Sequence, residues 1–207
     1  MVSQICEATL DRIADSLVAN GYVIATDIVP DEVSRLLREK VINTRYSDFK
    51  KAAIGRGNDQ QVSADIRSDK ISWLAASDPI DEAYLTLMTQ LREGLNRRLF
   101  MGLFDYESHY AVYEAGAFYK KHVDALKGTQ NRILTTVFFL NPDWQPEHGG
   151  VLAIYEEDDS LLELVAPKMG TMVIFLSERF PHEVQTSFAT RASIAGWFRV
   201  SNSVYGF

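Results

Sequence analysis

Residues 132–156 have the sequence RILTTVFFLNPDWQPEHGGVLAIYE. Two runs of apolar, β-branched and aromatic residues, 132–141 and 150–156, flank a segment that is rich in proline, aspartate and glycine. Runs of the first kind are typical of β-strands, and segments of the second kind are typical of turns. The stretch therefore predicts two strands joined by a turn.

The same pattern of short strands separated by turn signals extends over residues 105–200, with no helical pattern between them. The predicted strands are SHYAVYE, AFYKKHVDA, RILTTVFFLN, GVLAIYE, LLELVAP, GTMVIFLS, HEVQT and RASIAGWFRV. Eight short strands in succession are typical of a double sheet or jelly roll.

The first half of the chain has a helical pattern instead. Apolar residues recur at helical spacing over residues 3–19, from Pro30 to about Lys51, and from Ser77 to about Phe100. Asn20-Gly21 is expected to end the first helix, and short strands are predicted at 22–29 and 65–74. Residues 53–64, with few apolar side chains, predict an exposed, mobile loop. We expect an α+β chain with one domain over 1–207, in which 1–104 supports a β core at 105–200.

Composition excludes several classes of protein. The 207 residues are 46% hydrophobic and 24% charged, which is ordinary for one globular domain. A net charge of −7 argues against a nucleic-acid partner. The apolar run 132–140 is too short to span a bilayer, the first 17 residues lack a signal-peptide pattern, and the single Cys6 excludes an internal disulfide. We therefore expect a cytoplasmic protein with no membrane partner.

Three residues suit a metal site. His122 and Asp124 are two positions apart on a predicted strand, so their side chains would project from one face. If His182, which opens the predicted strand HEVQ, lies nearby, two imidazoles and a carboxylate would bind one face of an iron(II) ion and leave positions open for O₂ and a cosubstrate. Each residue alone also fits a structural role, and His109 and His148 are predicted to be structural or surface residues.

Arg191 follows His182 by nine positions. The sequence HEVQTSFATR predicts a strand, a connection and a second strand, and antiparallel pairing of the two would bring Arg191 beside the metal-bearing strand. A guanidinium can bind the far carboxylate of 2-oxoglutarate with two parallel hydrogen bonds. Arg179, in a turn, and Arg199, near the far end of the strand, are less favoured alternatives.

These motifs resemble a known family. HVD at 122–124, the histidine of FPHEVQ and the arginine of ATRASIAGWF are similar to the prolyl hydroxylase group of 2-oxoglutarate oxygenases. The resemblance is to the branch that contains the hypoxia-inducible factor prolyl hydroxylases and their bacterial homologues. It extends over residues 60–200 and includes DIRSDKISW, YEAGAFYKKHVDA and HGGVLAIY.

The resemblance implies a double-stranded β-helix that uses iron(II), 2-oxoglutarate and O₂, with ascorbate as reductant. It implies hydroxylation of a prolyl ring with release of succinate and CO₂, and no catalytic residue beyond the metal ligands. It also implies roles for further residues, each of which equally suits a barrel wall or an ion pair: Tyr113 and Thr135 beside the cosubstrate, Trp197 near the iron, Arg67 and Asp69 in substrate handling, and Arg132 near the substrate entrance.

One position departs from the family pattern. The family often has a tyrosine that donates a hydrogen bond to the cosubstrate carboxylate where this chain has Phe139. Loss of such a donor costs roughly 1.5–3 kcal/mol, so cosubstrate binding is expected to be weaker unless another donor replaces it.

The resemblance also suggests a substrate. Bacterial members of the branch are associated with a prolyl residue of elongation factor Tu, which is the leading candidate for a protein substrate here. The alternatives are the same oxidation of a small molecule or another residue type, a non-catalytic metal-binding sensor or scaffold, and a metallohydrolase. The last would need a general base, and no further carboxylate lies at an obvious spacing.

Overall fold

The computed structural model describes residues 4–44, 49–51, 65–125 and 131–201, except the side chain of Lys51. Three helices, eleven strands and a 3-10 helix (Pro146–His148) lie in these ranges. The helices are α1 (Glu7–Asn20), α2 (Asp31–Asn43) and α3 (Pro79–Leu99). The strands are β1 (Tyr22–Ala25), β2 (Lys50–Lys51), β3 (Lys70–Trp73), β4 (Leu103–Tyr113), β5 (Tyr119–His122), β6 (Arg132–Phe139), β7 (Leu152–Tyr155), β8 (Leu161–Val165), β9 (Met172–Leu176), β10 (His182–Val184) and β11 (Arg191–Val200).

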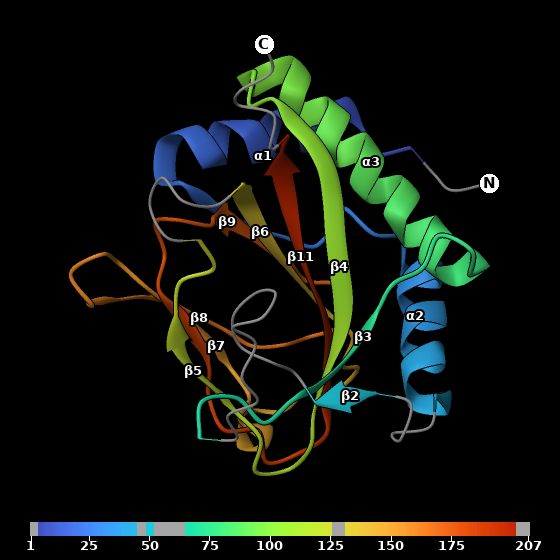
Figure 1. The fold of residues 1–207 in the computed structure, drawn as a ribbon, viewed down its shortest axis with the longest axis vertical. Helices are drawn as coiled ribbons and strands as arrows, with labels where there is room; N and C mark the ends of the chain where they lie inside the picture. The colour runs from blue at the N-terminus through green and yellow to red at the C-terminus, as the bar shows by residue number, and fades with distance from the viewer. Residues whose placement is uncertain (1–3, 45–48, 52–64, 126–130, 202–207) are drawn as a thin grey trace.

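The strands form two antiparallel sheets (Figure 1). The larger has the order β1-β9-β6-β11-β4-β3-β2, and the smaller has the order β5-β10-β7-β8. One cluster of buried apolar side chains contains residues of both sheets, among them Phe139 of β6 and Ile154 of β7. The sheets therefore pack face to face, which confirms the predicted jelly-roll core of a double-stranded β-helix.

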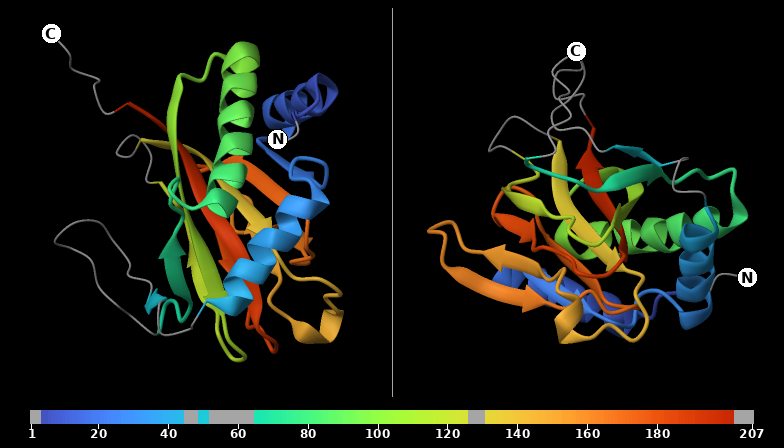
Figure 2. Two further views of the ribbon diagram at one scale, coloured as in Figure 1. Left: turned by 90° about the vertical axis from the view of Figure 1, so that its right-hand side faces the viewer. Right: turned by 90° about the horizontal axis from the view of Figure 1, so that it is seen from below.

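The helices cover the outer face of the larger sheet (Figure 2). A second cluster joins the buried sides of α1, α2 and α3 to Ala192, Ile194 and Phe198 of β11. Because side chains alternate along a strand, the odd-numbered residues of β11 belong to the inner face. Arg191, Ser193 and Trp197 are thereby directed toward the smaller sheet.

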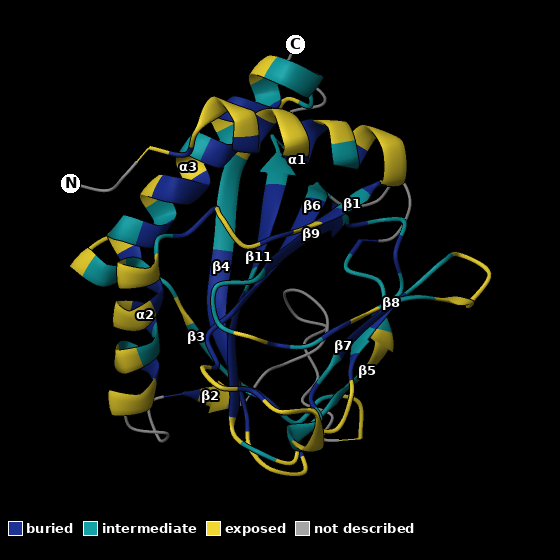
Figure 3. Cartoon of the chain, turned by 180° about the vertical axis from the view of Figure 1, so that it is seen from behind, coloured by how far each residue is buried: buried dark blue, intermediate teal, exposed yellow. Residues whose placement is uncertain are grey.

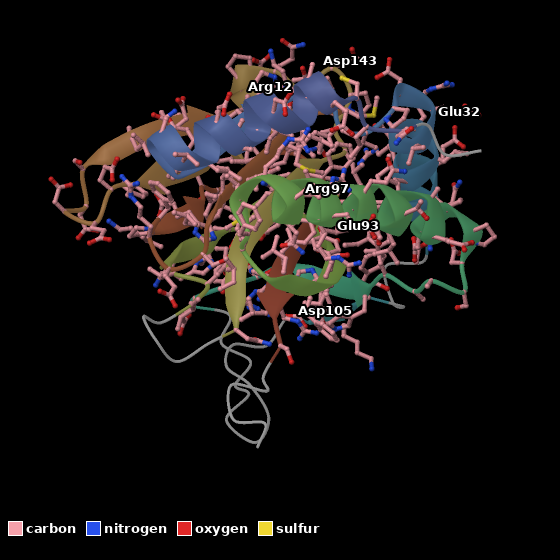
Figure 4. The ribbon with its side chains drawn as sticks, turned by 90° about the horizontal axis from the view of Figure 1, so that it is seen from above. Arg12, Glu32, Glu93, Arg97, Asp105 and Asp143 are labelled. Carbon is pink, nitrogen blue, oxygen red and sulfur yellow. The ribbon has the colours of Figure 1, made fainter. Side chains whose placement is uncertain are left out.

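Burial follows this layering. Figure 3 shows buried residues along the strands of the larger sheet, while the outward sides of the helices are exposed. Charged side chains lie on the outside, as Figure 4 shows for Arg12 on α1, Glu32 on α2 and Arg97 on α3. No helix among the described residues is long and apolar enough to cross a membrane.

The predicted N-terminal elements are confirmed in kind, with changed limits. Gly21 ends α1 in a left-handed conformation (φ 81°), and Asp78 caps α3 by accepting hydrogen bonds from two backbone N–H groups. The prediction that the second helix reaches Lys51 was wrong, because Thr44 is extended and ends α2, and Lys50–Lys51 pair with β3. The predicted loop at 53–64 lies outside the described residues.

Candidate metal and cosubstrate site

Two histidines meet across a strand pair. His122 on β5 is directly opposite His182 on β10, and their ring centroids are 4.4 Å apart. Nδ1 of each ring lies close to the backbone carbonyl two residues earlier, 2.8 Å from Lys120 for His122 and 3.0 Å from Phe180 for His182. Protons on both Nδ1 atoms satisfy these carbonyls and leave each Nε2 with a free lone pair.

Asp124 completes the cluster. Its Oδ1 lies 3.5 Å from Nε2 of His122, and its Oδ2 lies 3.6 Å from Nε2 of His182. In the described part of the chain, these are the residues whose ligand atoms gather for a metal, all within 4.8 Å of one another. Divalent ions bind such atoms at about 2.0–2.2 Å, which places neighbouring ligand atoms roughly 3 Å apart. Two imidazoles and one carboxylate at these distances fit iron(II) with small adjustments.

The electrostatics favour the same use. Burial by itself raises the pKa of Asp124, but His182 and His122 outweigh it and hold that pKa well below its usual value. Burial, together with the charge of His122, lowers the pKa of His182 to about 4. A carboxylate and neutral imidazoles are the forms that bind metals.

The local geometry of Asp124 differs from the prediction. The predicted strand at 117–125 is shorter, because β5 ends at His122 and Asp124 lies in the bend that follows. The carboxylate therefore reaches the histidines from a loop, and not from the same strand face as His122.

Arg191 comes from the opposite sheet. The prediction that its strand pairs with the metal-bearing strand was wrong, because β10 belongs to the smaller sheet and β11 pairs with β4 and β6. The connection at 185–190 crosses between the sheets. The inner face of the larger sheet carries Arg191, which has no exposed surface.

The guanidinium of Arg191 is incompletely paired. Its Nε donates to the carbonyl of Gly150 at 2.9 Å and its Nη1 to Oγ of Ser193 at 3.2 Å, whereas buried Nη2 has no partner among the described residues. The rings of Tyr113 and Phe139 lie 4.9 and 5.2 Å from its Cζ. A buried donor without a partner is costly, so this arrangement points to an anionic ligand, and the far carboxylate of 2-oxoglutarate fits it.

Gly150 shapes this pocket. Its φ of +61° belongs to the left-handed region, and a Cβ placed there would lie 3.0 Å from Cδ of Arg191. Glycine thus allows the backbone to approach the guanidinium closely enough to accept its hydrogen bond. The last glycine of the HGG sequence at 148–150 is therefore required by the close contact with Arg191.

The other residues predicted for the cosubstrate lie on the same inner face. Tyr113 is directly opposite Arg191, and burial raises its pKa. Trp197 is directly opposite Thr135, and its buried indole N–H acts on the carboxylate of Asp124, whose pKa it helps to lower. The hydroxyl of Thr135 donates to Oδ2 of Asp124 at 2.8 Å.

The residues predicted to handle the substrate are held in ion pairs and lie against aromatic rings. Arg67 donates two hydrogen bonds, of 2.8 and 2.6 Å, to buried Asp69. Its guanidinium also lies 4.4 Å from the ring of Tyr119, which stacks on His122 at 3.7 Å. Arg132 donates to Glu107, and its guanidinium lies 3.7 Å from the ring centroid of Trp197.

Sequence reasoning did not assign His109 or Ser193, two buried residues of the inner face, to the site. His109 is buried, with ring centroids 5.2 Å from Trp73 and 5.5 Å from Trp197, and burial lowers its pKa to about 4. It lies four positions before Tyr113 on β4, so strand alternation could have placed it on the inner face. Ser193 lies two positions after Arg191 on β11, so the same alternation could have placed it beside Arg191. His148, in contrast, is half-buried in the turn where it was predicted and accepts from the N–H of Gln145.

Comparison with known proteins gives concordant matches. A profile of the 2OG-Fe(II) oxygenase superfamily matches residues 108–199. Egl nine homolog 1 of Rattus norvegicus is 30% identical over 200 residues, which cover 91% of this chain and 58% of that protein. Prolyl hydroxylase EGLN3 of Mus musculus is 30% identical over 198 residues, which cover 91% of this chain and 82% of that protein. The chain spans about half of the length of the Egl nine homolog 1 relatives.

Solved structures agree. A prolyl-4-hydroxylase of Pseudomonas putida has a TM-score of 0.84 and 32% identity, with 93% of this chain and all of that chain covered. A prolyl hydroxylase of Trichoplax adhaerens, in complex with a peptide of hypoxia inducible factor, has a TM-score of 0.81 and 24% identity, with 93% and 90% covered. At that identity, the second likeness supports the fold alone.

Proposed function

Because the chain belongs to the prolyl hydroxylase family of iron(II)- and 2-oxoglutarate-dependent oxygenases, we propose that it hydroxylates a prolyl residue of a protein substrate. The products from the cosubstrates would be succinate and CO₂, and ascorbate would keep the iron reduced. One observation carries the proposal: His122, Asp124 and His182 converge on one point, while the opposite sheet carries Arg191 with an unpaired buried donor.

Each part of the site then has a role. His122, Asp124 and His182 would hold the iron, and Arg191 would bind the far carboxylate of 2-oxoglutarate through Nη2. Bound iron(II) and 2-oxoglutarate supply the oxidising chemistry, which no side chain can supply. Tyr113 and Phe139 exclude water around the guanidinium, so its attraction for the carboxylate is less screened.

Ser193 would replace the donor that Phe139 lacks. The two residues are directly opposite each other on β11 and β6, so both side chains project from the inner face. Oγ of Ser193 accepts from Arg191, which leaves its own proton for the carboxylate that Arg191 binds. A hydroxyl both accepts and donates, and Ser193 can therefore serve both groups.

The substrate would bind between the wall residues. We assign Arg67, Asp69, Arg132 and Trp197 to this wall, and His109 with them, because its ring lies beside Trp197. An exposed loop at 53–64 is still a prediction from the sequence, as is the cytoplasmic location. Elongation factor Tu is the leading substrate, and support for prolyl hydroxylation comes from the 30% identity to prolyl hydroxylase EGLN3.

The decisive experiment measures two products together. The protein is incubated with iron(II), ascorbate, 2-oxoglutarate and purified elongation factor Tu, and succinate and oxygenated prolyl residues are quantified by mass spectrometry. We expect both to appear in equal amounts, and neither with the Asp124→Ala variant.

The same assay separates the alternatives. Succinate without peptide oxidation would favour a small-molecule substrate or another residue type. An absence of succinate with every substrate candidate, despite tight metal binding, would favour a sensor or scaffold. Hydrolysis of a substrate without 2-oxoglutarate would favour a metallohydrolase.

A further inference from the structure

Asp124 differs from the two histidines in how the backbone supports it. His122 and His182 belong to paired strands, and a backbone carbonyl orients each ring. Asp124 lies past the end of β5, in a bend that contributes no strand pairing. Its carboxylate must therefore be oriented by side chains if it is to meet the histidines.

Two buried hydroxyl groups meet this need. Oγ1 of Thr135, on β6, lies 2.8 Å from Oδ2 of Asp124 and 3.0 Å from Oγ of Ser177, which follows β9. Thr135 is 1% exposed and Ser177 is fully buried. A buried hydroxyl that bonds only other side chains has a fixed role, since water does not compete for it.

The direction of both hydrogen bonds follows from proton counting. An ionised carboxylate only accepts hydrogen bonds, so Thr135 must donate its single proton to Asp124. Thr135 then has only lone pairs for Ser177, and Ser177 must be the donor of the second bond. The three side chains form a directed relay, Ser177 to Thr135 to Asp124, in which each bond polarises the next.

Ser177 also holds the backbone next to Asp124. Its carbonyl accepts from the N–H of Ala125 at 3.3 Å, while its own N–H donates to the carbonyl of Ile133 at 3.0 Å. The bend that carries Asp124 is thereby attached to β6 and β9 by its backbone as well as by its carboxylate. Both attachments include Ser177.

We propose that Thr135 and Ser177 are positioning residues for Asp124, and that their relay sets the affinity of the site for its divalent metal. The inference rests on the proposed function for the identity of the metal site. Thr135 occupies Oδ2, so Oδ1, which is nearer to His122, is the oxygen left for the ion. This assigns Thr135 to the metal, whereas the family resemblance placed it beside the cosubstrate.

Binding of Mn²⁺ tests the relay without any turnover. Titrations compare the unmodified protein with Thr135→Val, which keeps the shape and removes the hydroxyl, with Thr135→Ser, with Ser177→Ala and with Thr135→Val/Ser177→Ala. The matched control is Thr136→Val, because the adjacent Thr136 hydroxyl faces the helical side and lies 2.7 Å from Tyr106 Oη. Melting temperatures without metal verify that each variant folds.

We expect Thr135→Val to weaken Mn²⁺ binding about 10- to 100-fold, the range typical of groups that orient metal ligands. Ser177→Ala should weaken it less, and the double variant should equal Thr135→Val, because the two hydroxyls act in series. Thr135→Ser and Thr136→Val should bind Mn²⁺ like the unmodified protein.

Two results would overturn the relay. The first is unchanged Mn²⁺ affinity in Thr135→Val, and weakened 2-oxoglutarate binding in the same variant would then return Thr135 to the cosubstrate. The second is a double variant whose loss is the product of the single losses. A failure to hydroxylate prolyl substrates would contradict the proposed function and leave these titrations unaffected.

Discussion

Nη1 of Arg191 donates a 3.2 Å hydrogen bond to Oγ of Ser193, two residues further along the same face of β11. The pair is fully buried opposite Tyr113 and Phe139, and the remaining Nη2 has no partner among the described residues. An arginine, a serine and two aromatic rings from three adjacent strands thus lie together around one unpaired, buried N–H donor.

The Ser193→Ala variant is expected to bind 2-oxoglutarate more weakly by about tenfold or more. A hydrogen bond to a charged group contributes about 1.5–3 kcal/mol, and Phe139 offers no substitute hydroxyl. Calorimetric titration of the Mn²⁺-loaded protein with 2-oxoglutarate measures the effect. Ser34→Ala, which removes a buried hydroxyl from α2, serves as control, and equal affinity of the Ser193 and Ser34 variants would contradict the assignment.

The Asp124→Ala variant is expected to lose turnover and to remain folded. Its carboxylate is held by side chains of the site and its backbone lies in a bend, so the strand pairing does not depend on it. Succinate release measures turnover, and circular dichroism measures the fold. Exposed Glu32→Ala is the control and should leave both unchanged, whereas residual turnover in Asp124→Ala would exclude this carboxylate as a metal ligand.

Stability should fall with acid through His109. Burial and the charge of Arg67 lower its folded-state pKa from 6.5 to about 4. Above pH 6.5 both states are neutral at this residue. Between pH 6.5 and about 4, His109 is protonated in the unfolded chain but remains neutral in the folded chain. The free energy of unfolding therefore decreases as pH falls.

The full effect amounts to at most about 3 kcal/mol. Urea unfolding at pH 7 and pH 4.5 measures it, and His109→Gln should lose less stability between these two pH values than the unmodified protein. An identical pH dependence in both proteins would show that His109 has the same pKa in the folded and unfolded states.

The ion pair of Arg67 and Asp69 is expected to be important for stability. The side chains are 10% and 0% exposed, so Asp69→Asn leaves a buried cation with a weaker partner, at a cost of about 3 kcal/mol. The exposed pair of Arg12 and Asp27 provides the contrast, with side chains 46% and 49% exposed. Asp27→Asn should cost about 1 kcal/mol or less, and urea unfolding that ranks the two variants in reverse would contradict the assigned burial.

Strand alternation and turn residues let the sequence predict much of this protein. The eight strands after residue 102, the limits of α3 and the caps at Gly21 and Asp78 all depend on neighbouring residues, and all were predictable. The HxD and histidine motifs, together with their spacing to Arg191, were enough to recognise the family. These signals depend on neighbouring residues or on the type of a single residue, so they can be recognised without a structure.

Only the tertiary structure decided which strands meet. It put β10 and β11 in different sheets, so that Arg191 reaches the site from the side opposite the histidines, and it placed Asp124 in a bend supported by Thr135 and Ser177. It also brought Ser193 opposite Phe139 and buried His109 between two tryptophans. These contacts join residues that are far apart in the chain. The order of the strands depends on the packing of the whole core, and no single segment of the sequence determines that packing.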